Sequence, residues 1–193
     1  MTTGSARDAA VVAARSGPHW AVFATTAGLI VVFDQLTKAW LAANLSPGEM
    51  LNVVGDLIRL VFSQNSGALF GLFRDNAALF GIVSLGVVGF IVLYHGRVGR
   101  SLYLSIALGL LLGGALGNLT DRLRLGYVID FVDLGIGGFR WYTFNVADAA
   151  ISTAIVMLVG AAIFPSLVGL DQKSSEKSTE KPTEKPTETP SDG

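Results

Sequence analysis

The sequence predicts an all-α membrane protein with four transmembrane helices and a small extracytoplasmic β-rich cradle. Only 15% of the 193 residues are charged, against about 25% in a typical soluble domain. Four apolar runs are long enough, at about 1.5 Å per helical residue, to cross a membrane. The segments between runs one and two and between runs three and four are instead rich in β-branched and aromatic residues. These observations divide the chain into a membrane part and a β-rich part.

The expected boundaries follow the chain in order. Residues 1–17 form a polar lead that we expect to be disordered and cytoplasmic, and a membrane domain is expected over residues 18–170. The repeats of Lys, Glu, Pro and Thr in residues 171–193 cannot bury a core, so we expect a disordered cytoplasmic tail. The predicted spans are residues 20–41, 77–94, 101–120 and 149–170, and the predicted outer β-rich segments are residues 43–76 and 121–148.

The first apolar run, Trp20 to Leu41, is predicted to be a retained transmembrane helix. A signal peptide is disfavoured because the apolar pattern continues past Asp34 and Lys38, and no small-residue cleavage site follows. These two charged residues lie four apart on one helical face. They could support a site, act in its chemistry directly, or form an interfacial ion pair in which Lys38 snorkels towards the headgroups.

The first outer segment contains a predicted strand at residues 57–64. Bare strands cannot face lipid, because their backbone groups would lack partners. This segment is therefore expected outside the bilayer, paired with the second outer segment. Leu69, Phe70, Leu72 and Phe73 could be core of the β-rich part or an apolar flap that dips towards lipid.

The loop at residues 95–100 joins the second and third spans and carries two arginines. Short basic segments prefer the cytoplasm, so both termini are expected inside and the β-rich segments outside. In the third span Gly109, Gly113 and Gly117 recur every four residues, which is the small-xxx-small pattern of closely packed membrane helices.

The second outer segment is predicted to form a β-hairpin that turns at Gly137 and Gly138. In that register Ile136 faces Phe139.

Counting outwards from this turn, Asp130 faces Asn145, and directly opposed residues have Cβ atoms roughly 4.5–5.5 Å apart. Asp148 follows at the mouth of the last span, so two carboxylates could converge at the membrane surface. Asp133 lies further towards the turn and is expected to be solvated. The alternative is that Asp148 is only the N-cap of the last helix and Asp130 a solvated loop carboxylate.

Elimination narrows the chemistry available on the outer side. There are no cysteines, and the two histidines, His19 and His95, both map to the cytoplasmic side. No His-Glu-x-x-His zinc motif occurs, and nothing in the local sequence supports a pair of Ser66 with Lys38. Carboxylate, amide and guanidinium groups remain. Two adjacent carboxylates can share a proton, so that one activates a water and the other donates to a carbonyl.

The third span ends in Asn118, Asp121 and Arg122. Asn118 and Arg122 share a helical face, with Asp121 beside them. They could be interfacial residues, or they could bind a substrate backbone and orient the two aspartates.

Five sequence blocks stand in order at the ends of the apolar runs. They are D-Q-L-T-K (34–38), N-S-G-A-L-F (65–70), G-G-A-L-G-N-L-T-D-R (113–122), V-I-D-F (128–131) and F-N-V-A-D (144–148). Each block alone is weak, but the ordered set is specific. Over roughly residues 20–170 the chain resembles lipoprotein signal peptidase, also called signal peptidase II, a family of bacterial membrane aspartyl proteases.

The resemblance implies a reaction. The family removes the signal peptide from prolipoproteins by cleaving on the amino side of a cysteine that carries diacylglycerol, with two aspartates that activate a water. Asp130 and Asp148 match the catalytic pair. The residues that match substrate-binding or supporting positions are Asn65, Asn118, Arg122, Asn145, Asp34, Lys38 and Asp121.

The resemblance also implies the setting of the reaction. The family uses no metal or other cofactor, and its partners are the lipidated prolipoprotein, membrane lipid and peptide inhibitors such as globomycin. The net charge of −1 argues against a nucleic-acid partner. We expect a monomer that crosses the bacterial cytoplasmic (inner) membrane several times, with its active site at the surface of the outer leaflet.

Two other functions fit parts of the sequence. A small proton-coupled transporter could use Asp34, Lys38 and Asp121 as a relay, but that function gives no reason for the β-rich segments. A non-catalytic adaptor could recruit partners through residues 171–193. Deleting that tail would remove an adaptor's function, whereas a protease should survive the deletion.

Overall fold

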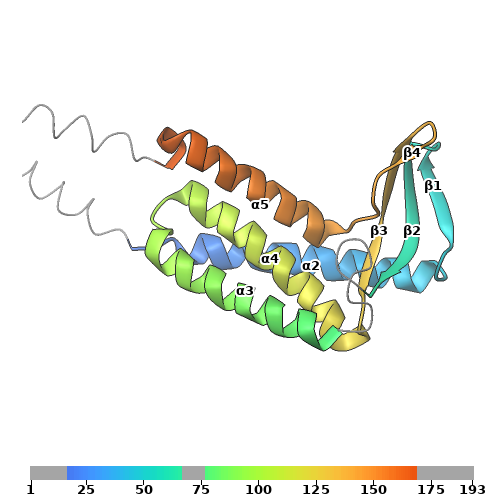
Figure 1. Cartoon of the computed structure of the whole chain (residues 1–193), viewed down its shortest axis with the longest axis horizontal. Helices are drawn as coiled ribbons and strands as arrows, with labels where there is room; N and C mark the ends of the chain where they lie inside the picture. Colours follow the sequence, from blue (N-terminus) through green and yellow to red (C-terminus); the bar gives the residue numbers. More distant parts are fainter. Residues whose placement is uncertain (1–16, 67–76, 169–193) are drawn as a thin grey trace, which may run out of the picture.

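The computed structural model describes residues 17–66 and 77–168, and for residues 77–81 it describes the backbone alone. The tail expected at 171–193, nearly all of the expected lead and the suggested flap around Phe70 lie outside the described residues. The described chain consists of long helices with a small antiparallel sheet at one end of them (Figure 1).

The helices are α2 (Trp20–Asn44), α3 (Ala77–Val98), α4 (Leu102–Leu125) and α5 (Val146–Ile163), followed by the short 3₁₀ helix η2 (Pro165–Val168). Of these, α2, α4 and α5 are long and apolar enough to cross a membrane. In α3 the part with described side chains, Ile82–Val98, is apolar but shorter. The described chain is therefore that of a mostly helical, multi-pass membrane protein.

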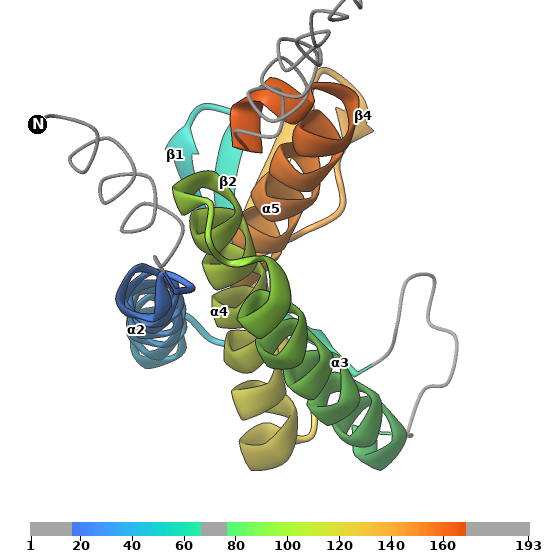
Figure 2. The ribbon, with the colours of Figure 1, turned by 90° about the vertical axis from the view of Figure 1, so that its left-hand side faces the viewer.

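Helix α4 is the centre of the helical part and packs against α2, α3 and α5 (Figure 2). Its glycines make the close approach possible. A Cβ at Gly109 would lie 2.8 Å from the Phe23 carbonyl oxygen of α2, and one at Gly113 would lie 2.8 Å from the Ala27 carbonyl oxygen of the same helix. The predicted packing role of the glycine repeat is thus confirmed.

The helix ends differ from the expected ones for local reasons. Helix α3 continues to Val98 through most of the segment expected to be a loop, and α4 continues five residues past Thr120. It ends at Gly126, whose φ of 80° lies in the left-handed region that favours glycine. Helix α5 ends at Ile163, two residues before Pro165, because a proline restricts the residue that precedes it.

The sheet has the strand order β1-β2-β3-β4, with all neighbours antiparallel. Its strands are β1 (Met50–Val54), β2 (Ile58–Asn65), β3 (Val128–Ile136) and β4 (Phe139–Arg140). The pairing of β2 with β3 confirms that the two outer segments pair with each other. A buried cluster of Leu41, Phe62, Ile129 and Phe131 packs the sheet against the end of α2.

The predicted hairpin is correct near its turn and wrong further out. Ile136 pairs with Phe139, with Gly137 in the left-handed region at φ 60°. Val132 then pairs with Phe144, where the extrapolated register would place Phe131. The returning chain has one extra residue beyond β4, so Asp130 and Asn145 are not ladder partners.

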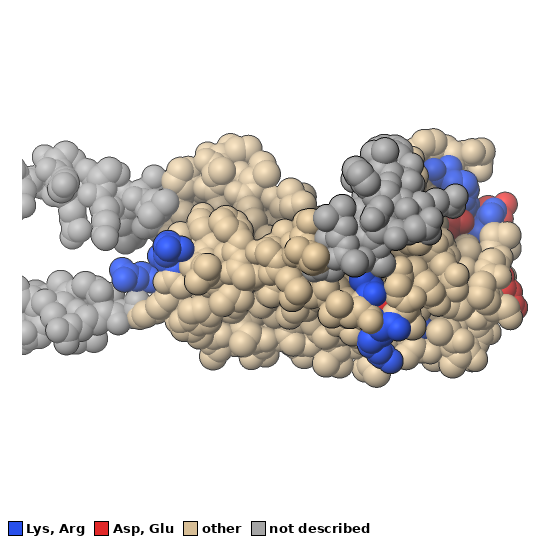
Figure 3. All heavy atoms as spheres, turned by 60° about the horizontal axis from the view of Figure 1, so that its bottom comes forward, with Lys and Arg blue, Asp and Glu red and all other residues tan. Residues whose placement is uncertain are grey.

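Charged side chains gather towards the two ends of the described molecule. The helical surface between them shows no Lys, Arg, Asp or Glu on the face drawn in Figure 3. Large apolar side chains are exposed along the same helices, among them Phe33 at 60%, Phe90 at 66% and Val156 at 71%. An uncharged apolar band of this kind is typical of a surface that faces lipid.

Candidate active site

The two predicted catalytic aspartates lie where the sheet meets the helices. Asp130 is on β3, and Asp148 is in the first turn of α5. Backbone hydrogen bonds from Phe131 and Val132 to the Phe144 carbonyl oxygen hold the chain before α5 against β3. Asp130 is buried at 4% exposure, whereas Asp148 is only half-buried. The pair therefore lies at the rim of the molecule's polar interior.

Asn145 connects the two aspartates and is fully buried. It is the N-cap of α5: its Oδ1 accepts from the Asp148 N–H at 2.9 Å, and its own N–H donates to Asp148 Oδ2 at 3.2 Å. Its side-chain Nδ2 donates to Asp130 Oδ1 at 2.8 Å. The N-cap is thus Asn145 and not Asp148, and the predicted closeness of Asp130 and Asn145 arises through side chains.

Asn118 supplies a second link, from α4. Its Nδ2 donates to Asp148 Oδ1 at 2.8 Å, and its Oδ1 accepts from Asn145 Nδ2 at 3.1 Å. Arg122, one turn later, lies with Nη1 3.4 Å from the Asn118 carbonyl oxygen. Its positive charge interacts with Asp148 and Asp130. The end of α4 therefore provides both a neutral donor and a cation beside the aspartates.

Asp130 has an unusual protonation equilibrium. Burial raises the pKa of Asp130 from 3.8 to about 6, and the charge of Asp148 also raises it. Hydrogen bonds from Asn65 and Asn145 oppose this rise, the first from Asn65 Nδ2 to Asp130 Oδ2 at 2.9 Å. A carboxyl with a pKa of about 6 is protonated in about one molecule in ten at pH 7, so Asp130 can serve as a proton donor.

The remaining predicted residues form a buried cluster behind Asn118. Lys38 Nζ lies 2.7 Å from Asp34 Oδ2, 2.9 Å from Asp121 Oδ2 and 3.0 Å from Asn118 Oδ1. Asp34 is 0% exposed, Lys38 2% and Asp121 3%. The suggestion that Lys38 snorkels in an interfacial pair is therefore wrong. The Asp34 Oδ1 atom also accepts from the Ala147 N–H in the first turn of α5.

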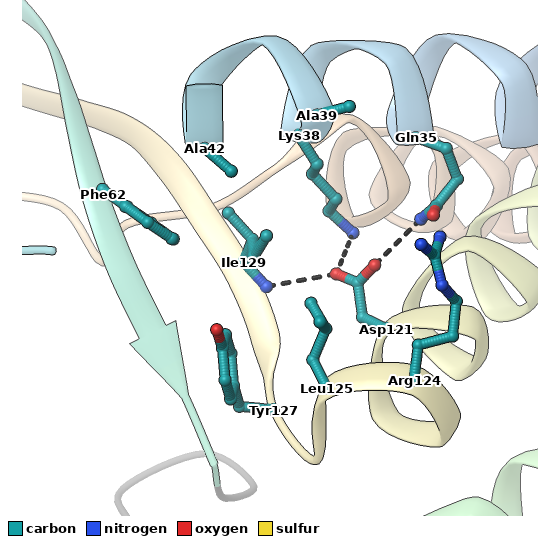
Figure 4. Close-up of a pocket in the computed structure, with 10 residues that line it drawn as sticks. All are labelled: Gln35, Lys38, Ala39, Ala42, Phe62, Asp121, Arg124, Leu125, Tyr127 and Ile129. Carbon is teal, nitrogen blue, oxygen red and sulfur yellow. Dashed lines mark hydrogen bonds and ion pairs between the residues drawn. The ribbon is translucent and has the colours of Figure 1, made fainter. Parts of the chain in front are cut away.

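Gln35 belongs to this cluster and was not among the predicted site residues. Its Nε2 donates to Asp121 Oδ1 at 2.9 Å (Figure 4). It lines a pocket of about 190 Å³ together with Lys38 and Asp121 at one end and apolar side chains such as Phe62 at the other (Figure 4). An uncharged side chain in an apolar run does not by itself predict a functional site. The position of Gln35 between Asp34 and Lys38 in the D-Q-L-T-K block was the feature that could have indicated it.

Asp133 differs from its expected solvated state. Its carboxylate pairs with Arg140, with Oδ2 2.5 Å from Nη2, and its side chain is 13% exposed. The hairpin turn brings Arg140 across from β3, which explains the pairing.

Among the described residues at this end of the molecule, no serine side chain is hydrogen-bonded to a histidine or to Lys38. His95 does contact Ser105, with Nε2 3.1 Å from Oγ, but both residues are fully buried. Ser105 donates to the Gly99 carbonyl oxygen, at the far end of the helices from the sheet. The partners of Lys38 are Asp34, Asp121 and Asn118, so its ammonium is not directed at Ser66.

All nine predicted site residues therefore come together. Eight share one hydrogen-bonded and ion-paired network, and Arg122 lies against it. Within the described ranges, no group of three or more His, Asp or Glu side chains is arranged to hold a metal ion.

Comparison with known proteins identifies the family of this chain. Residues 26–164 match the family model described as signal peptidase (SPase) II. The lipoprotein signal peptidase of Moorella thermoacetica is 39% identical over 145 residues, covering 75% of this chain and 94% of that protein. That of Syntrophomonas wolfei is 40% identical over 148 residues, covering 77% and 93%. That of Pseudomonas aeruginosa is 41% identical over 137 residues, covering 67% and 80%.

Two solved structures share the fold. Both are described as bacterial membrane enzymes determined by the in meso method. The one at 2.3 Å resolution has a TM-score of 0.72 and 25% identity, covering 87% of this chain and 98% of its own. The one at 1.9 Å has a TM-score of 0.71 and 27% identity, covering 77% and 96%. With the family model matched from α2 through α5, this chain belongs to the signal peptidase II family.

Proposed function

We propose that this protein is a membrane aspartyl endopeptidase that cleaves diacylglyceryl-modified prolipoproteins on the amino side of the lipidated cysteine. Membership of the signal peptidase II family makes it a protease that removes signal peptides from prolipoproteins. The observation that carries the finer proposal is that Asn145 hydrogen-bonds to both carboxyl groups, donating its side-chain Nδ2 to Asp130 Oδ1 and its backbone N–H to Asp148 Oδ2. One asparagine thereby holds two carboxyl groups at a common position.

In the proposed mechanism the two aspartates take different roles. Asp148, half-buried and facing the rim, accepts the proton of the attacking water as general base. Asp130, whose pKa burial raises to about 6, donates its proton to the oxygen of the scissile carbonyl. The water's oxygen bonds to the carbonyl carbon and gives a neutral gem-diol. Asp148 then passes its proton to the amide nitrogen as the C–N bond breaks, and Asp130 takes back a proton from one hydroxyl as the new carboxylic acid forms. The positive charge of Arg122 interacts with Asp130 and stabilises the carboxylate that Asp130 becomes once its proton has left.

The setting of the reaction follows from where the aspartates lie along the helices. We place α3 in the membrane as the fourth transmembrane helix. The end of the helices at which α3 connects to α4 then lies in the cytoplasm with both termini, and the sheet lies outside. Support comes from exposed aromatic residues at the sheet end, where Trp40 is 52%, Trp141 62% and Tyr142 66% exposed. Such residues mark membrane interfaces. The diacylglyceryl chains would then remain in the outer leaflet while the peptide reaches Asp148.

The test uses a diacylglyceryl-modified peptide and purified protein in lipid. Asp130→Asn and Asp148→Asn should each lower kcat by at least about a thousandfold, because each removes a proton-transfer group. Asp133→Asn is the matched control on the same strand and should retain cleavage, since Asp133 is paired with Arg140. A globomycin-type inhibitor should block the activity that remains in the control. Cleavage at a normal rate by either Asp130→Asn or Asp148→Asn would disprove the catalytic assignment.

A further inference from the structure

The cluster behind the aspartates contains more negative than positive charge. Asp34 and Asp121 supply two carboxylates, and Lys38 supplies one ammonium between them. All three residues are buried, so the second negative charge must be stabilised by dipoles and not by water. The backbone N–H groups of Ala147 and Ile129 donate to Asp34 Oδ1 and Asp121 Oδ2.

Gln35 satisfies the carboxylate oxygen that these groups leave over. Its Nε2 donates to Asp121 Oδ1 at 2.9 Å and also lies 3.2 Å from both Asp34 Oδ2 and the Gly117 carbonyl oxygen. Within the described part of the chain, Gln35 is the residue that donates a hydrogen bond to Asp121 Oδ1. Gln35 therefore bridges the two acids, and Figure 4 shows Gln35 and Ile129 on opposite sides of the Asp121 carboxylate.

The Lys38 ammonium has three charged or polar partners. It donates hydrogen bonds to Asp34 Oδ2 at 2.7 Å and to Asn118 Oδ1 at 3.0 Å, and it forms an ion pair with Asp121 Oδ2 at 2.9 Å. An ammonium only donates, so the oxygen of the Asn118 amide must face it. The amide's Nδ2 then faces Asp148, to which it donates at 2.8 Å. The orientation of the donor on Asp148 is thus set jointly by Asn145 Nδ2, which also donates to Asn118 Oδ1, and by a lysine whose recorded contacts do not include Asp148.

We propose that Gln35 is a positioning residue for Asp148, acting through Asp121, Lys38 and Asn118. By donating to Asp121 Oδ1, Gln35 leaves Lys38 centred between its three acceptors. Without that donor Asp121 has an unpaired buried oxygen, and the ammonium moves towards it as the nearest cation. Lys38 then withdraws from Asn118, whose Oδ1 keeps only the Asn145 donor, so the amide that donates to Asp148 is held less firmly. This inference rests on the proposed role of Asp148 in catalysis.

Gln35 acts from behind the strand that carries Asp130. It lines the pocket of about 190 Å³ that Ile129 also lines, and successive residues of a strand point to opposite faces of the sheet. Ile129 and Asp130 therefore face opposite sides of β3. A role for Gln35 in binding substrate beside Asp130 does not follow from this position, whereas a role in orienting Asn118 does.

The test compares Gln35→Met with Thr37→Val on the same helix turn. Thr37 donates to the backbone carbonyl oxygens of Phe33 and Asp34, so Thr37→Val removes a hydroxyl that bonds to none of the cluster's side chains. For Gln35→Met we expect kcat per folded molecule to fall by about tenfold with KM changed by less than about twofold. Thr37→Val should keep both constants. The folded fraction is measured by thermal unfolding of the same samples.

A second background separates positioning from general destabilisation. If Gln35 acts through Asn118, then Gln35→Met should cost less than about twofold in kcat when Asn118→Ala is already present. An equal loss in both backgrounds, or a lower unfolding temperature with unchanged kcat per folded molecule, would overturn the inference. If Asn118→Ala is too slow to measure, the kcat comparison with Thr37→Val decides alone. A failure of the proposed function can be told apart from a failure of this inference, because only the former predicts normal cleavage by Asp148→Asn.

Discussion

The hydrogen bond from Asn65 to Asp130 offers a direct way to move the pH profile of the enzyme. Asn65→Ala removes a donor 2.9 Å from Asp130 Oδ2 and leaves the Asn145 bond to Oδ1 in place. The lost bond favoured the ionised carboxylate, so its removal raises the pKa of Asp130 above about 6. In the proposed mechanism Asp130 must be protonated, and activity is therefore lost as the pH rises through that pKa.

The size of the effect can be estimated from the bond. Hydrogen bonds to charged groups contribute about 1.5–3 kcal/mol, and the lower value applies because Asn65 is itself exposed. Since about 1.4 kcal/mol corresponds to tenfold in an equilibrium constant, the proton affinity of Asp130 should rise roughly tenfold. The alkaline limb of the pH profile should accordingly move to higher pH by about one pH unit.

The assay is kcat/KM against pH for cleavage of a diacylglyceryl-modified peptide. The position of the alkaline limb is the quantity to compare, because Asn65→Ala can also weaken substrate binding and so lower the whole curve. Asn52→Ala, the same change on the neighbouring strand β1, is the control and should leave the limb in place. A limb that stays fixed or moves to lower pH in Asn65→Ala would refute the assignment of Asp130 as proton donor.

Three further perturbations test other parts of the structure. Gly117→Ala would place a Cβ 2.6 Å from Asp34 Oδ2, so it should destabilise the protein by about 1–3 kcal/mol and lower kcat, measured by thermal unfolding and cleavage. Gly99→Ala would place a Cβ against the His95 ring; it should lower the unfolding temperature while kcat per folded molecule stays unchanged. Because folding raises the pKa of Asp130 from 3.8 to about 6, the folded state binds this proton more tightly. This proton therefore adds about 3 kcal/mol to the free energy of unfolding below pH 4, and that contribution is lost as the pH rises to about 6. The unfolding temperature should therefore fall less between pH 4 and pH 7 in Asp130→Asn than in wild type, and parallel curves would contradict this.

The hairpin shows how far local sequence rules reach. The turn at Gly137 follows from the glycines, and the pairing of Ile136 with Phe139 follows from the turn. The ladder shifts by one residue before Phe144, and nothing in the local pattern marks that extra residue. The contact between Asp130 and Asn145 survives because the asparagine side chain reaches Asp130 from the start of a helix.

Other parts of the site depended on contacts distant in sequence. Asp133 looked solvated because Arg140, its partner, comes close only after the chain reverses. The polar residues after Asn118 suggested a helix end, yet Asp121 is satisfied by Gln35, Lys38 and the Ile129 N–H inside the fold. The helix can therefore continue to Leu125. The role of an amide such as Gln35 can be inferred only once both of its acidic neighbours are known to be buried.

Asn145 leaves almost no chemical alternative at its position. A helix start needs an acceptor, which Asp, Ser or Thr also provides. The same side chain must in addition donate to Asp130 and to Asn118. A carboxylate has no hydrogen to donate, and a hydroxyl has only one. A change of this one residue would therefore disturb the Asp130 carboxyl and the beginning of α5 together.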